Sequence, residues 1–104
     1  MGKMQTVDHE AGLLEDLLDP IFAVQYLNAC LEEEVEDSQE KRRLILSALS
    51  QVMKAHGLSK LSRDCGLNRG NLYDSIIKEK NTRLDTLLKI LDALQIRMKF
   101  EVSG

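Results

Sequence analysis

The order of hydrophobic and polar residues has the period of an amphipathic α-helix over most of the chain. Apolar side chains recur at spacings of three and four residues, which places them on one face of a helix. The clearest example is the stripe from Leu44 to Met53. The pattern predicts helices over residues 20–31, 38–56, 59–65, 68–78 and 82–94.

Several predicted helix starts carry residues that cap helices. Asp19 followed by Pro20 predicts a start, because a carboxylate accepts from free backbone N–H groups and proline has no N–H to leave unpaired. Asp37, with Ser38 as the competing residue, is predicted to cap the second helix. Thr82 is predicted to cap the last one.

The two ends of the chain depart from the long helical pattern. Residues 1–18 begin polar and end in leucines, and this pattern is too short to stand alone as a helix in water, so we expect a flexible arm or a lid that docks. After Gln95 the period changes to two, and the apolar positions are Ile96, Met98, Phe100 and Val102. This alternation predicts one short β-strand; a helix extension or a loose tail is the other interpretation.

Composition narrows the fold class. With 104 residues the chain has the size of one ordinary domain, which we expect over residues 19–104. One proline and few aromatic residues favour an all-α fold over a β-sandwich. No apolar run reaches the roughly 20 residues that span a bilayer, so we expect a cytoplasmic protein without membrane contact. Cys30 and Cys65 fit neither a disulfide framework nor a zinc site, and we expect no metal and no cofactor.

The charge is distributed unevenly. The net charge is −3, yet residues 1–56 hold five basic and eleven acidic side chains, whereas residues 57–104 hold nine basic and six acidic ones. Opposite signs on the two halves are expected if one half contacts phosphate and the other contacts a basic partner. Solvated helix faces alone would produce the same asymmetry.

Residues 58–77 have the chemistry of a DNA-binding helix-turn-helix. Gly66 permits the backbone turn between two short helices, and Ser62 is small where they approach each other. Ser75 stands where the pattern usually has an apolar anchor, so Ile76 or Ile77 is expected to serve instead. The expected inward positions are Leu61, Cys65, Leu67, Leu72 and Ile76.

Polar residues point outward from this motif. The first turns of the second helix enter the major groove in such folds, and the base-reading candidates there are Asn68, Arg69, Asn71 and Tyr73. The candidates for phosphate contacts on either side of the groove are Ser59, Lys60, Arg63, Lys78, Lys80, Asn81 and Arg83. Asp74 would repel phosphate.

Three stretches together resemble the HigA-like addiction-module antidote proteins, whose domain is of the lambda-repressor-like (XRE-type) helix-turn-helix class. They are Asp19-Pro-Ile-Phe-Ala-Val-Gln-Tyr-Leu-Asn, Cys65-Gly-Leu-Asn-Arg-Gly-Asn-Leu-Tyr and Asn81-Thr-Arg-Leu-Asp-Thr-Leu-Leu-Lys. The resemblance implies a five-helix lambda-repressor-like bundle. It also implies an antitoxin that binds a small basic ribonuclease toxin of the RelE type and represses its own operon. The charge split agrees with both partners, double-stranded operator DNA and a basic toxin.

The two expected partners suggest a function for each end of the chain. We expect a homodimer in which the strand over residues 96–102 pairs with its copy; addition of that strand to a toxin's sheet is the alternative. We expect the toxin to bind the acidic half of the chain, through the leucine-rich arm and the helix after Pro20. The expected toxin-binding side chains of the arm are Leu13, Leu14, Leu17 and Leu18. Catalysis is not expected, because His9 and His56 fit no catalytic or metal-ligand spacing. A solitary transcription regulator and a helical interaction module without DNA binding are the competing functions.

Overall fold

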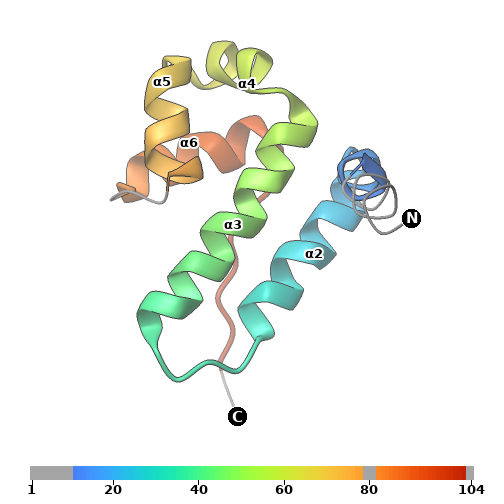
Figure 1. The fold of residues 1–104 in the computed structure, drawn as a ribbon, viewed down its shortest axis with the longest axis vertical. Coiled ribbons are helices and arrows are strands. Elements are labelled where there is room, and N and C mark those ends of the chain that lie inside the picture. The colour runs from blue at the N-terminus through green and yellow to red at the C-terminus, as the bar shows by residue number, and fades with distance from the viewer. Residues whose placement is uncertain (1–10, 79–81, 103–104) are drawn as a thin grey trace, which may run out of the picture.

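The structure is a computed structural model that describes residues 11–78 and 82–102. A helical segment at residues 11–16 is followed by α2 (Pro20–Glu32), α3 (Ser38–His56) and α4 (Leu58–Cys65). Next come α5 (Arg69–Leu72), which continues into the π-helical turn η1 (Tyr73–Ile77), and α6 (Leu84–Ala93). The long helix α3 runs through the middle, with α2 on one side and α5 on the other (Figure 1). The all-α prediction is confirmed.

Most predicted helix ends lie where the cap residues place them. The Asp19 carboxylate accepts from the backbone N–H of Ile21 at 3.0 Å, and the Asp37 carboxylate accepts from that of Gln39 at 2.9 Å. Gly57 ends α3 with a φ of 101°, which an L-residue rarely adopts, and its N–H donates to the carbonyl of Met53. These ends depend on local chemistry, which explains why the sequence predicts them.

The start of the last helix corrects one predicted cap. Arg83, rather than Thr82, is the N-cap residue of α6, and the Arg83 side chain makes no capping hydrogen bond. The Asp85 carboxylate lies 3.3 Å from Nε of Arg83 and accepts from the N–H of Thr86. The first turn of α6 therefore carries the Arg83–Asp85 ion pair and the hydrogen bond from Thr86 to Asp85, and the N-cap position is one residue later than predicted.

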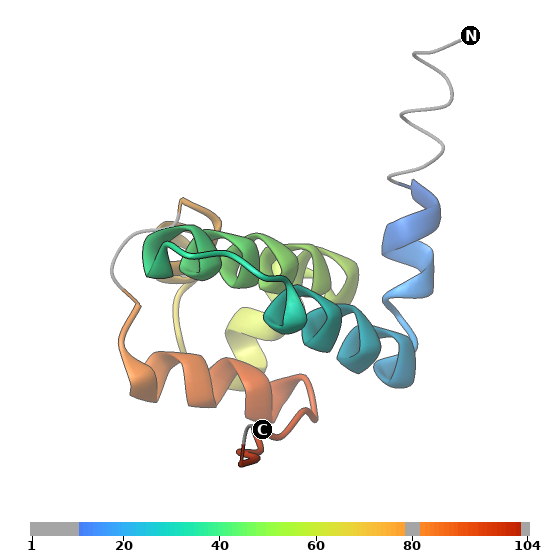
Figure 2. The ribbon, with the colours of Figure 1, turned by 90° about the horizontal axis from the view of Figure 1, so that it is seen from below.

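The core is built around α3 and reaches every helix. The largest fully buried side chains come from α3, α4, α5, η1 and α6: Leu49, Met53, Leu61, Leu72, Ile76 and Ile90. Helix α4 packs against both α3 and α6, which fixes α4 and the adjoining α5 on the rest of the molecule (Figure 2). No helix in the described ranges is both long and apolar enough to cross a bilayer.

The leucines before α2 do not share one environment. Leu17 is 3% exposed and belongs to the core, and Leu13 packs against the same core. Leu14 is half-buried, whereas Leu18 is 63% exposed. Leu17 therefore has its partners within this chain, and the segment at residues 11–18 docks on the body through it. Of the four predicted toxin-binding leucines, Leu18 is the most accessible.

The predicted C-terminal strand is absent from the described residues. Residues 96–102 follow α6 without regular secondary structure; Ile96 packs on the core, and Met98, Phe100 and Val102 are exposed. The alternating pattern is real, but a strand needs a second strand to accept its backbone hydrogen bonds. None of the described segments supplies one, so the strand prediction is wrong for the single chain.

Candidate nucleic-acid interface

Helices α4 and α5 are joined by a closed turn. Gly66 adopts the left-handed conformation with a φ of 71°, and the N–H of Leu67 donates to the carbonyl of Ser62 at 3.2 Å. The Ser62 hydroxyl donates back to the carbonyl of Leu67. These bonds satisfy backbone groups that a helix end would otherwise leave unpaired, and they hold the two helices at one angle.

The second helix of the motif is anchored through its inner face. Leu72 and Ile76 are fully buried, as is Leu61 of α4. Ile76 therefore serves as the second buried anchor of this helix after Leu72. Its position four residues after Leu72 places both side chains on the same face of the helix, which continues from α5 into η1. Anchoring this face leaves the other face turned to solvent.

Asn68 has a structural role that limits its use as a base reader. It is the N-cap of α5, and its side-chain oxygen accepts from the N–H of Asn71 at 2.7 Å. The oxygen needed for a bidentate contact with adenine is thus engaged within the chain. Asparagine is a preferred residue just before a helix. That preference is the sequence signal that indicates the cap.

The other base-reading candidates are exposed. Arg69 and Asn71 lie on the first turn of α5, and Tyr73 follows at its end, 43% exposed. The Lys78 ammonium lies 5.5 Å from the centre of the Tyr73 ring and 3.7 Å from a carboxylate oxygen of Asp74. Lys78 thus offsets the charge of Asp74, whose repulsion of phosphate was expected. The outer surface of the second helix is therefore polar, and the Arg69 side chain on it is exposed to solvent.

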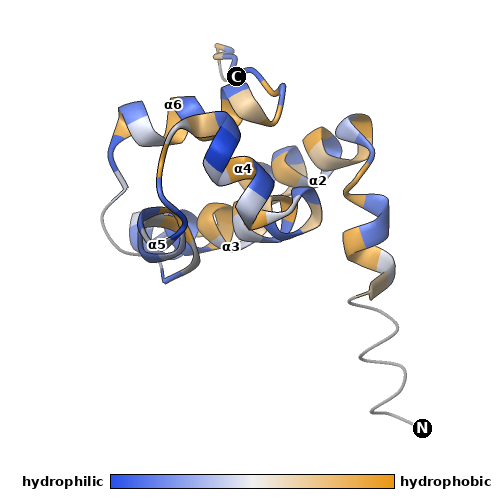
Figure 3. Ribbon diagram, turned by 90° about the horizontal axis from the view of Figure 1, so that it is seen from above, coloured by the Kyte–Doolittle hydropathy of each residue, from blue (hydrophilic) through white to orange (hydrophobic). Residues whose placement is uncertain are grey.

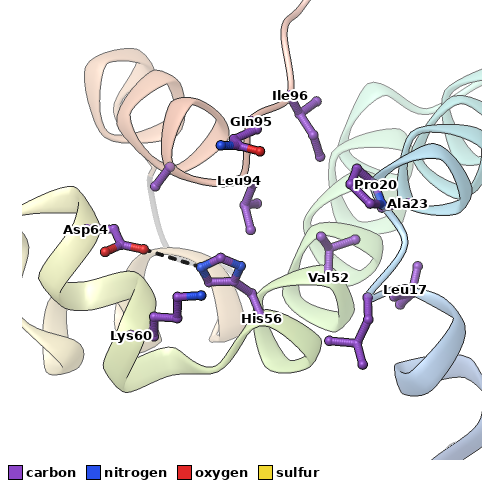
Figure 4. Close-up of a pocket in the computed structure, with 12 residues that line it drawn as sticks. Leu17, Pro20, Ala23, Val52, His56, Lys60, Asp64, Leu94, Gln95 and Ile96 are labelled. Atoms are coloured by element: carbon purple, nitrogen blue, oxygen red, sulfur yellow. Dashed lines mark hydrogen bonds and ion pairs between the residues drawn. The ribbon is translucent and has the colours of Figure 1, made fainter.

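The phosphate candidates do not all lie together. Ser59 and Arg63 are exposed and one turn apart on α4, and Arg83 is exposed but paired with Asp85. Lys60 instead borders a cleft on another side of α4 (Figure 4). Lys80 and Asn81 lie outside the described residues.

The cleft beside α4 contains a pair that sequence reasoning missed. It measures about 300 Å³ and lies where the segment before α2, the end of α3, α4 and the end of α6 meet. In it, Nε2 of His56 lies 3.5 Å from a carboxylate oxygen of Asp64 (Figure 4). The pair connects the end of α3 to α4 across Gly57. The two residues are eight apart in sequence, and only the turn at Gly57 brings them together.

The cysteines have the properties of packed thiols. The Cys65 thiol lies 3.7 Å from the carbonyl oxygen of Lys89 on α6. Burial raises the pKa of Cys65, and the carboxylates of Asp64 and Asp92 raise it further. Burial also raises the pKa of Cys30. A raised pKa lowers the thiolate fraction at neutral pH, which disfavours nucleophilic chemistry. The described residues contain no group of three His, Cys, Asp or Glu side chains placed to hold a metal.

Comparison with known proteins places this chain in a family. Residues 8–102 match the family described as "Probable addiction module antidote protein". The chain belongs to this antidote family. An uncharacterized protein of Haemophilus influenzae is 32% identical over 78 residues, which cover 75% of this chain and 74% of that relative. No solved structure matches the chain. Membership of an antidote family implies a toxin as a partner in general terms.

Proposed function

We propose that this antidote-family protein is the antitoxin of a type II toxin–antitoxin module. It binds operator DNA through α4 and α5, neutralises a small basic toxin of the RelE type, and represses its own operon. The family match supports the antitoxin role. The long resemblance to HigA-like proteins supports the lambda-repressor-like class and the RelE-type partner.

One observation carries the DNA-binding half of the proposal. The second helix of the motif is held by buried Leu72 and Ile76, while Arg69, Asn71 and Tyr73 on it are exposed. A helix fixed on one side and polar on the other is suited to the major groove, where arginine recognises guanine and asparagine recognises adenine. Arg63, together with Lys78 and Lys80, supplies candidates for phosphate contacts.

The DNA-binding unit is a homodimer in this proposal. One recognition helix makes few contacts, and proteins of this class read paired half-sites about one helical turn apart. The exposed side chains Met98, Phe100 and Val102 supply the interface when the segment pairs with its copy across a two-fold axis. Pairing would provide the neighbouring strand that the described residues of the single chain do not supply.

A mobility shift on DNA from the protein's own promoter tests the proposal. Arg69→Ala should lose about 1 to 3 kcal/mol of operator affinity and relax the preference at one base position. Arg63→Ala should weaken all sequences alike and reduce the salt dependence by about one phosphate contact. Unchanged affinity in both variants would show that the assigned DNA-binding face is wrong.

The competing functions give different outcomes. A helical interaction module without DNA affinity would produce no salt-dependent shift on any promoter fragment. A solitary regulator would bind its operator and have no small basic protein encoded in the neighbouring reading frame. Operator binding together with protection from the neighbouring gene product in a growth assay is the result expected of an antitoxin.

A further inference from the structure

Helix α2 is hydrophobic on two sides, and the residues that the structure describes cover only one of them. Ala23 on the inner side is 1% exposed where α2 packs on α3. On the outer side Ile21, Val24 and Leu31 are 71%, 38% and 46% exposed. Together with Asn28 they are spaced by three, four and three residues, which places them on one face of the helix. We call this set the α2 outer face.

The α2 outer face differs from an ordinary solvated helix surface. A surface helix normally presents polar residues to water, and a helix that is apolar all round is normally covered on all sides. Within α2 only Gln25, Asn28 and Glu32 carry an amide or charged side chain. Figure 3 shows hydrophobic ribbon along much of this helix. The composition is that of a helix covered on both sides.

Acidic side chains precede and follow the α2 outer face along the sequence, and basic ones are absent from the same stretch. Residues 11–37 include no lysine, arginine or histidine. The acidic residues of this stretch are all exposed: Glu15, Asp16, Asp19, Glu32, Glu33, Glu34, Glu36 and Asp37. Within the part of the chain that the structure describes, none of them forms an ion pair. An apolar stripe between two clusters of carboxylates without ion pairs complements a protein surface that has an apolar patch bordered by lysine and arginine.

We propose that the α2 outer face is the docking surface for the basic toxin, and that the toxin presents a hydrophobic patch flanked by lysine or arginine. This inference rests on the proposed antitoxin function and assigns its toxin-binding surface. A second copy of this chain is a poorer occupant, because a two-fold contact between α2 helices would bring carboxylates against carboxylates.

The position of α2 keeps this surface away from the DNA-binding helix. Helices α2 and α5 lie on opposite sides of α3 in both views of the molecule (Figures 1 and 3). A toxin seated on the α2 outer face therefore leaves the exposed surface of α5 free.

Charge substitution on the α2 outer face tests the proposal. The probe is the small basic protein encoded next to this chain, and its affinity for the full-length antitoxin is measured by calorimetry. Ile21→Lys combined with Leu31→Lys should weaken binding at least about 30-fold, because a lysine at each end of the contact removes apolar area and repels a basic partner. The matched control is Leu84→Lys with Leu88→Lys on α6, because these two leucines are 65% and 47% exposed in the unmodified chain. The control should bind as the unmodified chain does.

The outcomes separate the inference from the proposed function. If the unmodified chain does not bind the neighbouring gene product, the toxin half of the proposed function fails. If the unmodified chain binds and the α2 variant binds equally well, the docking surface is wrong while the function stands. Conversion of a dimer to a monomer in sedimentation of the α2 variant would assign this face to a second copy and overturn the proposal. Thermal unfolding verifies that the variants fold, and Ile21→Lys alone is the milder variant.

The carboxylates give an independent measurement on the same surface. Glu33→Gln with Glu34→Gln should slow toxin association several-fold at low salt and leave dissociation nearly unchanged, because charges at the edge of an interface act mainly on encounter. An association rate equal to that of the unmodified chain at low salt would contradict the charge complementarity.

Discussion

At the scale of single residues, the structure separates side chains that look equivalent in sequence. Leu17 and Leu18 are neighbours in the same leucine-rich stretch, yet Leu17 is buried in the core and Leu18 is exposed. Asn68 and Asn71 both belong to the predicted DNA-binding surface, yet Asn68 caps the helix that carries Asn71. Each difference predicts a different effect of substitution.

Leu17→Ala should destabilise the fold by about 2 to 4 kcal/mol, because it removes buried methyl groups and leaves a cavity. Leu18→Ala should change stability by less than about 0.5 kcal/mol, since its side chain already contacts water. Denaturant unfolding followed by circular dichroism measures both. Equal stability of the two variants would show that the segment before α2 does not dock.

Two substitutions at Asn68 separate its capping role from DNA recognition. Asn68→Ala loses the hydrogen bond to Asn71 and should cost about 0.5 to 2 kcal/mol of stability. Asn68→Asp keeps a capping oxygen and should retain stability, but its negative charge should weaken DNA binding and do so most at low salt. An Asn68→Asp variant that binds operator DNA normally would place Asn68 away from the phosphates.

At the scale of elements, hydrogen bonds between neighbouring residues form the turn between α4 and α5, and contacts with α3 and α6 set where the pair lies. The turn at Gly66 and the cap at Asn68 involve residues within five positions of each other. The contact between His56 and Asp64 connects α3 to α4, and α4 also packs against α6. The motif is thus recognisable in sequence, whereas its orientation depends on the whole bundle.

The C-terminal segment is the element through which the proposed dimer is tested. Met98→Pro removes a backbone N–H at the middle of residues 96–102, so it should convert a dimer that pairs through this segment into monomers and weaken operator binding cooperatively. Met98→Val preserves the N–H and is the control. Sedimentation at several protein concentrations measures the effect. A Met98→Pro dimer of unchanged stability would assign the interface to the helices.

At the scale of the whole molecule, the two proposed partners bind on opposite sides. Because α3 separates α2 from α5, operator-bound antitoxin should accept the toxin without releasing DNA, and the mobility-shift band should move to a slower position (Figure 1). Light scattering on the same mixture should give the mass of the ternary complex. Release of free DNA at saturating toxin would show that the two surfaces compete.

Local chemistry by itself determined a large share of this fold. Helical periodicity gave the helices, and the caps at Asp19, Asp37 and Gly57 placed their ends, because each cap bonds to backbone only a few residues away. The two short helices around Gly66 could be predicted for the same reason: Gly66 and the spacing of the apolar residues are features of one short stretch. The excess of acidic residues in the first half is also a property of the sequence alone.

Tertiary structure decided which of these features are available to a partner. Burial of Leu17 and exposure of Ile21, Val24 and Leu31 depend on which face of each helix meets α3, and an apolar pattern does not distinguish a covered face from an open one. The period of two after Gln95 predicts a strand, but a strand exists only where another supplies its hydrogen bonds. Packing and pairing join residues that are distant in sequence, so they are settled only once the whole chain has folded.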